Sequence, residues 1–141
     1  MKRNTIGDCR IVDLPKILDP RGNLTFLESN KHAPFEIKRV YYIYDVPGGE
    51  SRGAHAHIDT ESVMIAMSGS FDIVVDDGQK RIKFQLNRAY YGLYLPKMIW
   101  RGMENFSSGA VCLVVASTFY SVEDYVRDYD KFKELKENGD F

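Results

Sequence analysis

The sequence has few cysteines, no long hydrophobic run and almost no net charge. Cys9 and Cys112 are the only cysteines among 141 residues, and neither has a zinc-ligand or CxxC spacing. No apolar run approaches the ~20 residues of a membrane-spanning helix. A formal net charge of −1 argues against binding nucleic acid or anionic membranes through bulk positive charge. We therefore expect a cytoplasmic protein with no nucleic-acid or membrane partner.

Short hydrophobic runs alternate with turn residues along most of the chain. Val, Ile, Tyr, Phe and Leu fill runs that we predict as strands, at 22–28, 38–46, 61–67, 70–76, 79–86, 89–95 and 110–117. The Asp77-Gly78 pair supplies the positive φ of a tight hairpin turn. Many short strands with frequent turns predict an all-β fold, either a sandwich or a barrel. With no linker or repeat, one domain is expected over 1–141, with the barrel over 1–120.

The hydrophobic period changes near the C-terminus. Tyr125, Tyr129 and Phe132 recur at i, i+4 and i+7, which is the spacing of one helix face. Ser121 is a suitable N-cap residue, with Asp124 three positions later. The sequence therefore predicts one C-terminal α-helix over 121–137, packed on the barrel through its aromatic residues.

Two of the three histidines, His55 and His57, are two positions apart, so they point to the same face of a strand. Gly49 lies six positions before this pair, and Glu61 and Gly69 follow it at wider intervals. The spacing resembles the first signature of the cupin superfamily, whose members are small jelly-roll β-barrels. In that family the two histidines and the glutamate are commonly metal ligands.

The second cupin signature is altered at Arg101, which stands where the third ligand histidine is expected. A guanidinium stays protonated, offers no lone pair and repels a divalent cation. A metal held by His55, His57 and Glu61 alone stays an alternative, but we expect neither a metal nor another cofactor. Two histidines in a pocket then provide a base and its partner, because imidazole titrates near neutral pH.

Segments over nearly the whole chain are similar to the dTDP-4-keto-6-deoxyglucose 3,4-ketoisomerases, a branch of the cupins. These segments are DPRGNL at 19–24, FEIKRVYYIYD at 35–45, RGAHAH at 52–57, GLYLP at 92–96 and DYVRDY at 124–129. The resemblance implies that a dTDP-linked 4-keto-6-deoxy sugar is isomerised through an enediol, which moves the ketone from C4 to C3. The product would be a dTDP-3-keto-6-deoxyhexose for 3-amino-3,6-dideoxy sugar biosynthesis.

The resemblance also implies roles for individual residues. His55 is expected as the leading base and His57 as its partner, although their spacing does not decide the order. Tyr41 is favoured over Tyr42, on the opposite strand face, as a hydrogen-bond donor to the sugar. Guanidinium groups bind phosphate oxygens bidentately, so the candidates for the diphosphate are Arg21, Arg39, Arg52 and Arg101. Glu28 is a candidate for contact with the thymine.

A homodimer with exchanged N-terminal strands is a further expectation. In the related dTDP-sugar 3,5-epimerases, the arginine of the D-x-R-G motif reaches the nucleotide of the neighbouring subunit, and Arg21 occupies that motif here. Pairing of this kind also covers the exposed edges of a small sheet.

Three alternatives remain open. A dTDP-sugar 3,5-epimerase would need a tyrosine acid over the opposite ring face, and the double histidine favours the ketoisomerase. A non-enzymatic sugar-nucleotide-binding cupin would need no acid–base pair. A metal-dependent cupin dioxygenase is disfavoured by Arg101. Some ketoisomerases carry a histidine at this position, so the C4 configuration of the product, gluco or galacto, stays open.

Overall fold

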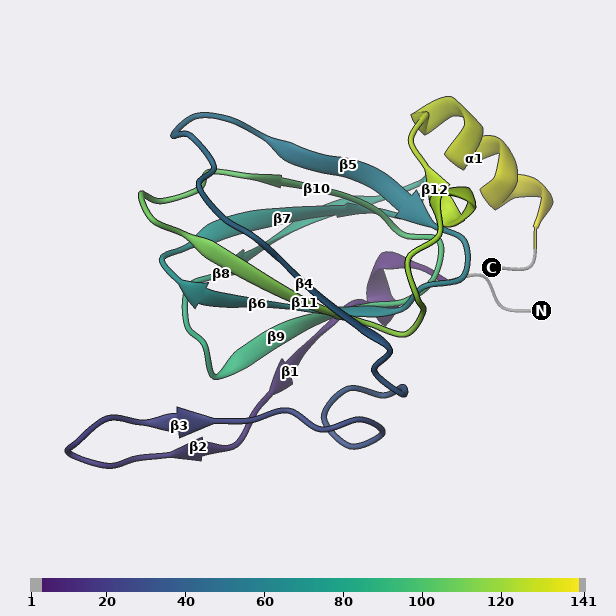
Figure 1. Cartoon of the computed structure of the whole chain (residues 1–141). Helices are drawn as coiled ribbons and strands as arrows, with labels where there is room; N and C mark the ends of the chain where they lie inside the picture. Colours follow the sequence, from purple (N-terminus) through teal and green to yellow (C-terminus); the bar gives the residue numbers. More distant parts are fainter. Residues whose placement is uncertain (1–3, 140–141) are drawn as a thin grey trace.

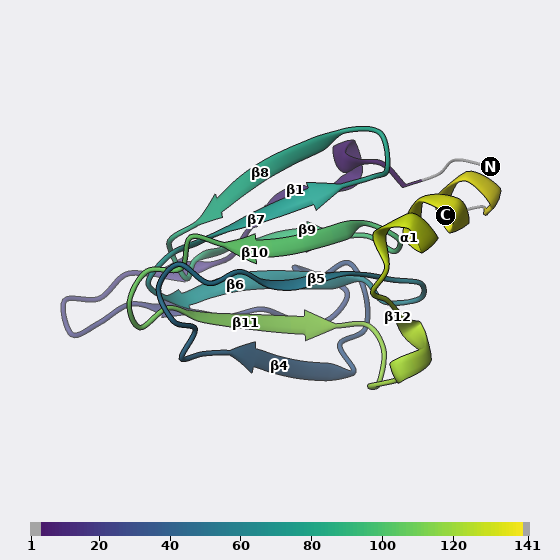
Figure 2. The ribbon, with the colours of Figure 1, turned by 90° about the horizontal axis from the view of Figure 1, so that it is seen from above.

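The computed structural model describes residues 4–139, in which two five-stranded antiparallel sheets face each other (Figures 1 and 2). The first sheet has the order β1 (Arg10–Asp13), β9 (Tyr91–Leu95), β6 (Ser62–Ser68), β11 (Val111–Ala116) and β4 (Arg39–Ile43). The second has the order β12 (Tyr125–Val126), β5 (Arg52–His57), β10 (Trp100–Glu104), β7 (Phe71–Asp76) and β8 (Arg81–Leu86). The predicted all-β barrel of jelly-roll, cupin type is confirmed, with one α-helix near the C-terminus.

Alternating side chains build the core between the sheets. Phe71, Ile73 and Val75 of β7 are fully buried and belong to one cluster with Cys112 and Val114 of β11, as the two-residue period of a strand requires. The predicted hairpin at Gly78, where φ is +93°, joins β7 to β8. Strand β10 was not predicted, because its sequence, WRGME, lacks a run of β-forming residues.

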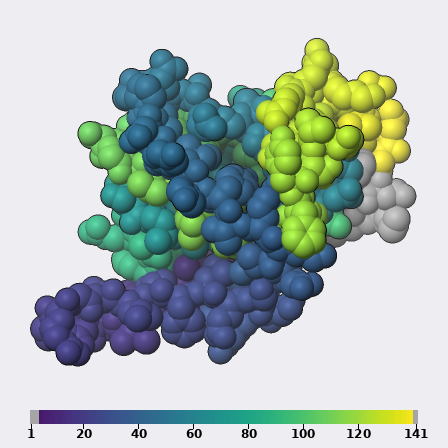
Figure 3. Space-filling model, in the orientation of Figure 1, coloured from purple at the N-terminus to yellow at the C-terminus, as the bar shows by residue number. Residues whose placement is uncertain are grey.

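The N-terminal region leaves the body of the molecule as an arm. Strands β2 (Lys16–Ile17) and β3 (Leu24–Thr25) pair with each other and project from the barrel (Figures 1 and 3). The predicted strand over 22–28 is thus reduced to two residues. The segment that follows the arm returns to the barrel, where Phe35 packs in one cluster with Val63 and Ile65.

The predicted helix over 121–137 is wrong in its first half. A 3₁₀ turn, Val122–Asp124, and strand β12 come first, and helix α1 (Tyr129–Asn138) begins only after Asp128, whose side chain caps it. Asp124 is used elsewhere, because its carboxylate is bonded to buried partners in the barrel. Among residues 4–139, no helix is long and apolar enough to cross a membrane.

Helix α1 packs against the second sheet. Phe132 is fully buried and forms one cluster with Ala56, Met98 and Val126, and Trp100 packs against this cluster. Ala56 is the residue between the two histidines of β5. The helix therefore supports the strand that carries them.

A substitution at Gly69, in the turn between β6 and β7, should destabilise the fold. Gly69 has a φ of +68°, and a Cβ there would lie 2.9 Å from the backbone Cα of Ala110. Gly109 has a φ of +72° but no atom within 4 Å of its Cβ position. We expect Gly69→Ala to lower the free energy of unfolding by about 3 kcal/mol and Gly109→Ala by about 1 kcal/mol. Urea unfolding at one protein concentration measures both, and equal losses would show that the close approach is unimportant.

Candidate active site

A cavity of about 400 Å³ lies between β4 and the β5–β12 edge of the second sheet. Its lining includes the polar side chains of Tyr41, Arg52, His55, Arg101, Tyr125 and Arg127. The described residues thus bring a tyrosine of β4, a histidine of β5 and an arginine of β10 to one place, as a site for an anionic polar ligand requires.

The two histidines contact each other, and one of them lines this cavity. His55 and His57 point to one face of β5, and their Nε2 atoms are 3.1 Å apart. His55 lines the cavity, whereas His57 is fully buried behind it. Of the two, His55 is therefore the histidine that a ligand in the cavity can reach, and its role as the base stays a prediction.

Asp124 completes a line of side chains behind the histidines. Its Oδ2 atom lies 2.8 Å from Nδ1 of His57 and also accepts a hydrogen bond from the Thr60 hydroxyl. Neither residue is predicted from the sequence. The pattern around Asp124 indicates a helix-capping residue, and Thr60 belongs to no motif. The only signal for Asp124 was its place in the DYVRDY segment of the family resemblance.

Burial and nearby positive charge keep both imidazoles neutral. Burial, followed by the charge of Arg101, lowers the pKa of His55 to about 2. The same two causes lower the pKa of His57 to about 4, where Asp124 opposes them. Both imidazoles therefore have an unprotonated nitrogen at physiological pH, but their pKa values lie well below the near-neutral value expected from the sequence, which makes each a weaker base in this structure.

Arg101 lies deep in the cavity. It stands opposite His55 in the β5–β10 register and is only 2% exposed. Its Nε atom donates to the carbonyl of Ile99, and its Nη2 atom has no hydrogen-bond partner among the described residues. A buried guanidinium with a spare N–H is suited to bind an oxyanion.

His55, His57 and Glu61, which occupy the ligand positions of the first cupin signature, do not point to a common centre. Glu61 accepts a hydrogen bond from the hydroxyl of Tyr94 at 2.6 Å, whereas His57 bonds to Asp124. Within residues 4–139, no group of three His, Cys, Asp or Glu side chains is arranged to hold a metal ion.

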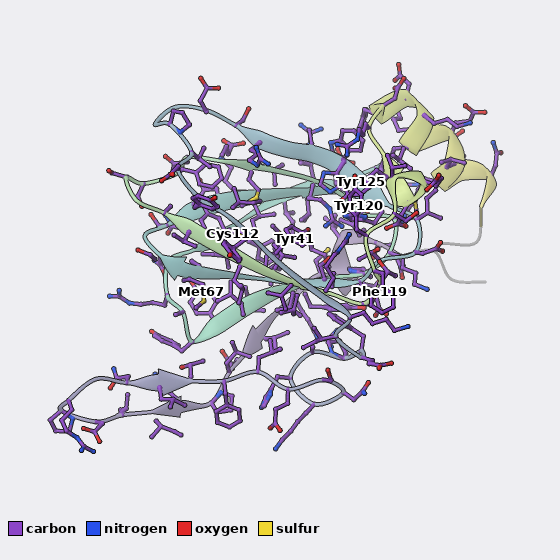
Figure 4. The ribbon with its side chains drawn as sticks, in the orientation of Figure 1. Tyr41, Met67, Cys112, Phe119, Tyr120 and Tyr125 are labelled. Carbon is purple, nitrogen blue, oxygen red and sulfur yellow. The ribbon has the colours of Figure 1, made fainter. Side chains whose placement is uncertain are left out.

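Tyr41 and Tyr125 line the cavity, and Tyr120 lies outside the lining with its ring centroid 6.0 Å from that of Tyr125. Figure 4 shows Tyr41, Tyr120 and Tyr125 near one another, and the Arg39 guanidinium lies 5.3 Å from the Tyr41 ring and 5.7 Å from the Tyr120 ring. Tyr41 packs inward and Tyr42 is 61% exposed, but both belong to the lining of the cavity, so the preference for Tyr41 as the donor to the sugar stays a prediction. Tyr120 and Tyr125 were not predicted as site residues.

Tyr125 is in direct contact with the histidine pair. Its ring centroid lies 5.1 Å from that of His55 and 4.5 Å from that of His57. Arg127 stacks over the same tyrosine at 4.4 Å. Tyr125 was assigned to the predicted helix, and its position in β12 makes it part of the site instead.

Arg21 and Glu28 do not reach the cavity of their own chain. Arg21, at the tip of the β2–β3 arm, is paired with Asp19 at 2.7 Å, and Glu28 is paired with Lys31 at 3.7 Å. Their roles in nucleotide binding therefore depend on a second chain and stay predictions.

Known proteins are similar to this chain in sequence and fold. The family model described as "FdtA: WxcM-like, C-terminal" matches residues 7–137. The TDP-4-oxo-6-deoxy-alpha-D-glucose-3,4-oxoisomerase of Aneurinibacillus thermoaerophilus is 44% identical over 124 residues, which are 88% of this chain and 89% of that protein.

Two solved structures are similar over nearly their whole length. WlaRB, a TDP-quinovose 3,4-ketoisomerase from Campylobacter jejuni, is 53% identical, with 90% of this chain and 98% of that chain covered and a TM-score of 0.86. A histidine-to-asparagine variant of the 3,4-ketoisomerase QdtA from Thermoanaerobacterium thermosaccharolyticum, in complex with TDP-4-keto-6-deoxyglucose, is 34% identical. That comparison covers 93% of this chain and 95% of that chain, with a TM-score of 0.90. With a matching family model, closely similar sequences and a shared fold, the chain belongs to the FdtA-like family of sugar 3,4-ketoisomerases.

Proposed function

We propose that this protein moves the ketone of dTDP-4-keto-6-deoxy-D-glucose from C4 to C3 by metal-independent proton transfer through an enediol. The C3–H and O3–H bonds break while C4–H and O4–H bonds form, so the reaction is balanced without an oxidant or reductant. The observation that carries the proposal is a neutral His55 that faces the cavity beside the buried Arg101. The resulting 3-ketone is the group that amination at C3 requires.

His55 takes the proton from C3, which is acidic because it is adjacent to the C4 ketone. The negative charge then develops on the enediolate oxygens, and the spare N–H of Arg101 stabilises it. Tyr41 supplies a hydrogen bond to the sugar from β4. The hydroxyl proton passes from O3 to O4 of the enediolate, and the same protein base then returns a proton to C4.

This mechanism changes the role expected for Arg101. The sequence made Arg101 a candidate for binding the diphosphate. Because Arg101 is only 2% exposed, the proposal assigns it to the oxygens of the sugar instead. Arg39 and Arg52 remain candidates for the diphosphate, and Arg52 is exposed where it lines the cavity.

An NMR time course of dTDP-4-keto-6-deoxyglucose in deuterated buffer tests the proposal. A 3-keto product supports it, with hydrogen at C4 where the abstracted proton is returned directly and deuterium where it first exchanges with solvent. The H4–H5 coupling of the product made in ordinary water distinguishes the gluco from the galacto product. Deuterium at C3 and C5 with the ketone still at C4 would identify a 3,5-epimerase instead. Binding without any exchange would leave a sugar-nucleotide-binding module.

We also propose a homodimer with exchanged N-terminal strands. Leu18 at the arm is 69% exposed, and Ile17 and Leu24 are also exposed. A groove of about 750 Å³ runs between this arm and the outer face of the first sheet, where Met67 and Leu113 line it. An exposed apolar arm beside an apolar groove fits a second copy of the chain, and the exchange would bring Arg21 toward the partner.

Leu18→Asp should weaken this dimer. A carboxylate buried in an apolar interface costs about 3 kcal/mol, which raises the dimer dissociation constant about 100-fold. Light scattering coupled to size-exclusion chromatography at micromolar concentration should then report a monomer. The control is Ile82→Asp, an exposed apolar residue on β8 of the other sheet. A monomeric wild-type protein, or loss of the dimer in the control alone, would contradict the proposal.

A further inference from the structure

We propose that Asp124 is a positioning residue that fixes a hydrogen on Nδ1 of His57 and makes His57 the group that carries the positive charge after His55 has removed the proton from C3. The proposal rests on the proposed function, because it concerns the base of the same reaction. It adds three residues to the site, Asp124, Thr60 and Thr118, which lie behind the cavity.

The Asp124 carboxylate is surrounded by donors. The backbone N–H of Asp59 donates to Oδ1 at 2.6 Å, and the Thr60 hydroxyl and His57 Nδ1 both contact Oδ2. Burial alone raises the pKa of Asp124, but these hydrogen bonds outweigh burial and hold the pKa below its ordinary value. Asp124 is therefore ionised and acts only as an acceptor.

An acceptor at this position determines the tautomer of His57. The contact of 2.8 Å requires a hydrogen on Nδ1, so the lone pair of the neutral ring is on Nε2. That lone pair faces Nε2 of His55 at 3.1 Å. In the neutral pair, the hydrogen between the two rings must then belong to His55.

The same reasoning orders the two threonines. Thr60 is fully buried, and its single hydroxyl hydrogen goes to Asp124, which cannot donate. The 2.6 Å contact between the Thr60 and Thr118 hydroxyls therefore has Thr118 as donor. On one side, Thr118 donates a hydrogen bond to Thr60 and Thr60 donates one to Asp124. On the other side, His55 donates to His57 and His57 donates to Asp124.

This order of donors lets the positive charge move away from His55 after it has accepted the proton. When Nδ1 of His55 accepts the proton from C3, the hydrogen already on Nε2 of His55 passes to Nε2 of His57. One C–H bond and one N–H bond break, and two N–H bonds form. The positive charge then lies on His57, in contact with the Asp124 carboxylate, whereas His55 has no carboxylate partner among the described residues. Reversal of the transfer returns the proton to the substrate.

A purely structural role for Asp124 is the alternative. Its backbone carbonyl accepts from the N–H of Ile58 at 3.0 Å, so the residue also ties the loop after β11 to the end of β5. A structural role predicts lower stability on substitution but an unchanged turnover number in the folded protein.

Asp124→Asn distinguishes the two roles. We expect kcat to fall about 100-fold with KM within about twofold of wild type, because the amide cannot hold a charged His57. The matched control is Glu123→Gln, an exposed carboxylate in the same 3₁₀ turn, which should leave kcat unchanged. Proton–nitrogen correlation NMR of the imidazoles should show His57 with its hydrogen on Nδ1 in the wild type and not in Asp124→Asn.

Thr60→Val is the second variant, used where Asp124→Asn does not fold. It removes one donor from Asp124 and should lower kcat about 10-fold, again with little change in KM. A folded Asp124→Asn protein with wild-type kcat, or a wild-type His57 with its hydrogen on Nε2, would overturn the proposal. The tautomer is measured without turnover, so a wild-type protein that has the Nδ1 tautomer but no isomerase activity would refute the proposed function alone.

Discussion

His55→Asn is expected to lower kcat for ketone migration by about 10³-fold to 10⁴-fold. Asparagine keeps a polar side chain in the cavity but has no nitrogen that can accept the C3 proton. His57 cannot replace the missing base, because it is fully buried and does not line the cavity. The NMR time course measures the loss as slower appearance of the 3-keto product.

His32→Asn provides the control for this substitution. His32 is the third histidine, and its Nδ1 accepts from the backbone N–H of Glu28 on the N-terminal arm, outside the cavity. Its turnover should equal that of wild type. Retention of more than a tenth of the wild-type rate in His55→Asn would show that another group removes the proton.

Arg101→Met should produce the second large effect, a fall in kcat of about 100-fold to 1000-fold. Methionine roughly fills the volume of the arginine stem but leaves the enediolate oxygen without its cationic donor. Arg101→Lys keeps the positive charge and should lose less activity. Equal losses in the two variants would show that shape, not charge, determines the function of this position.

The pH profile of Arg101→Met provides an independent readout. In the wild type, burial and the Arg101 charge lower the pKa of His55 to about 2, so the base stays neutral and activity should persist as the pH falls below 5. Removing the charge makes protonation of His55 easier, so its pKa rises toward the ordinary value. The acid limb of kcat/KM should therefore move to higher pH in Arg101→Met, and no movement would contradict the assigned cause.

Local sequence patterns predicted the features that depend on strand period. The two-residue interval of His55 and His57 placed both imidazoles on one face, and neighbours on a strand separated Tyr41 from Tyr42. The many short apolar runs predicted an all-β sandwich or barrel, and the resemblance to the cupins implied the jelly-roll type. In each case the relevant physics acts over a few residues.

The missed features depend on contacts between distant segments. Asp124 is 67 positions from His57 and 64 from Thr60, so no local pattern reveals that its carboxylate forms hydrogen bonds with these two residues. Without that carboxylate as a cap residue, the helix begins later and Tyr125 joins a strand. The burial of Arg101, which changes its expected role, is also a tertiary property.

Helix α1 packs against the strand that carries both histidines of the site. Phe132 packs in one buried cluster with Ala56, the residue between the two histidines, and with Val126 next to Tyr125. Detachment of the helix would expose the back of β5 and remove the packing that sets the angle of both imidazoles. Melting of the tail and inactivation should therefore be one cooperative event, and proteases that trim this protein from its C-terminal side should abolish turnover once they pass Phe132.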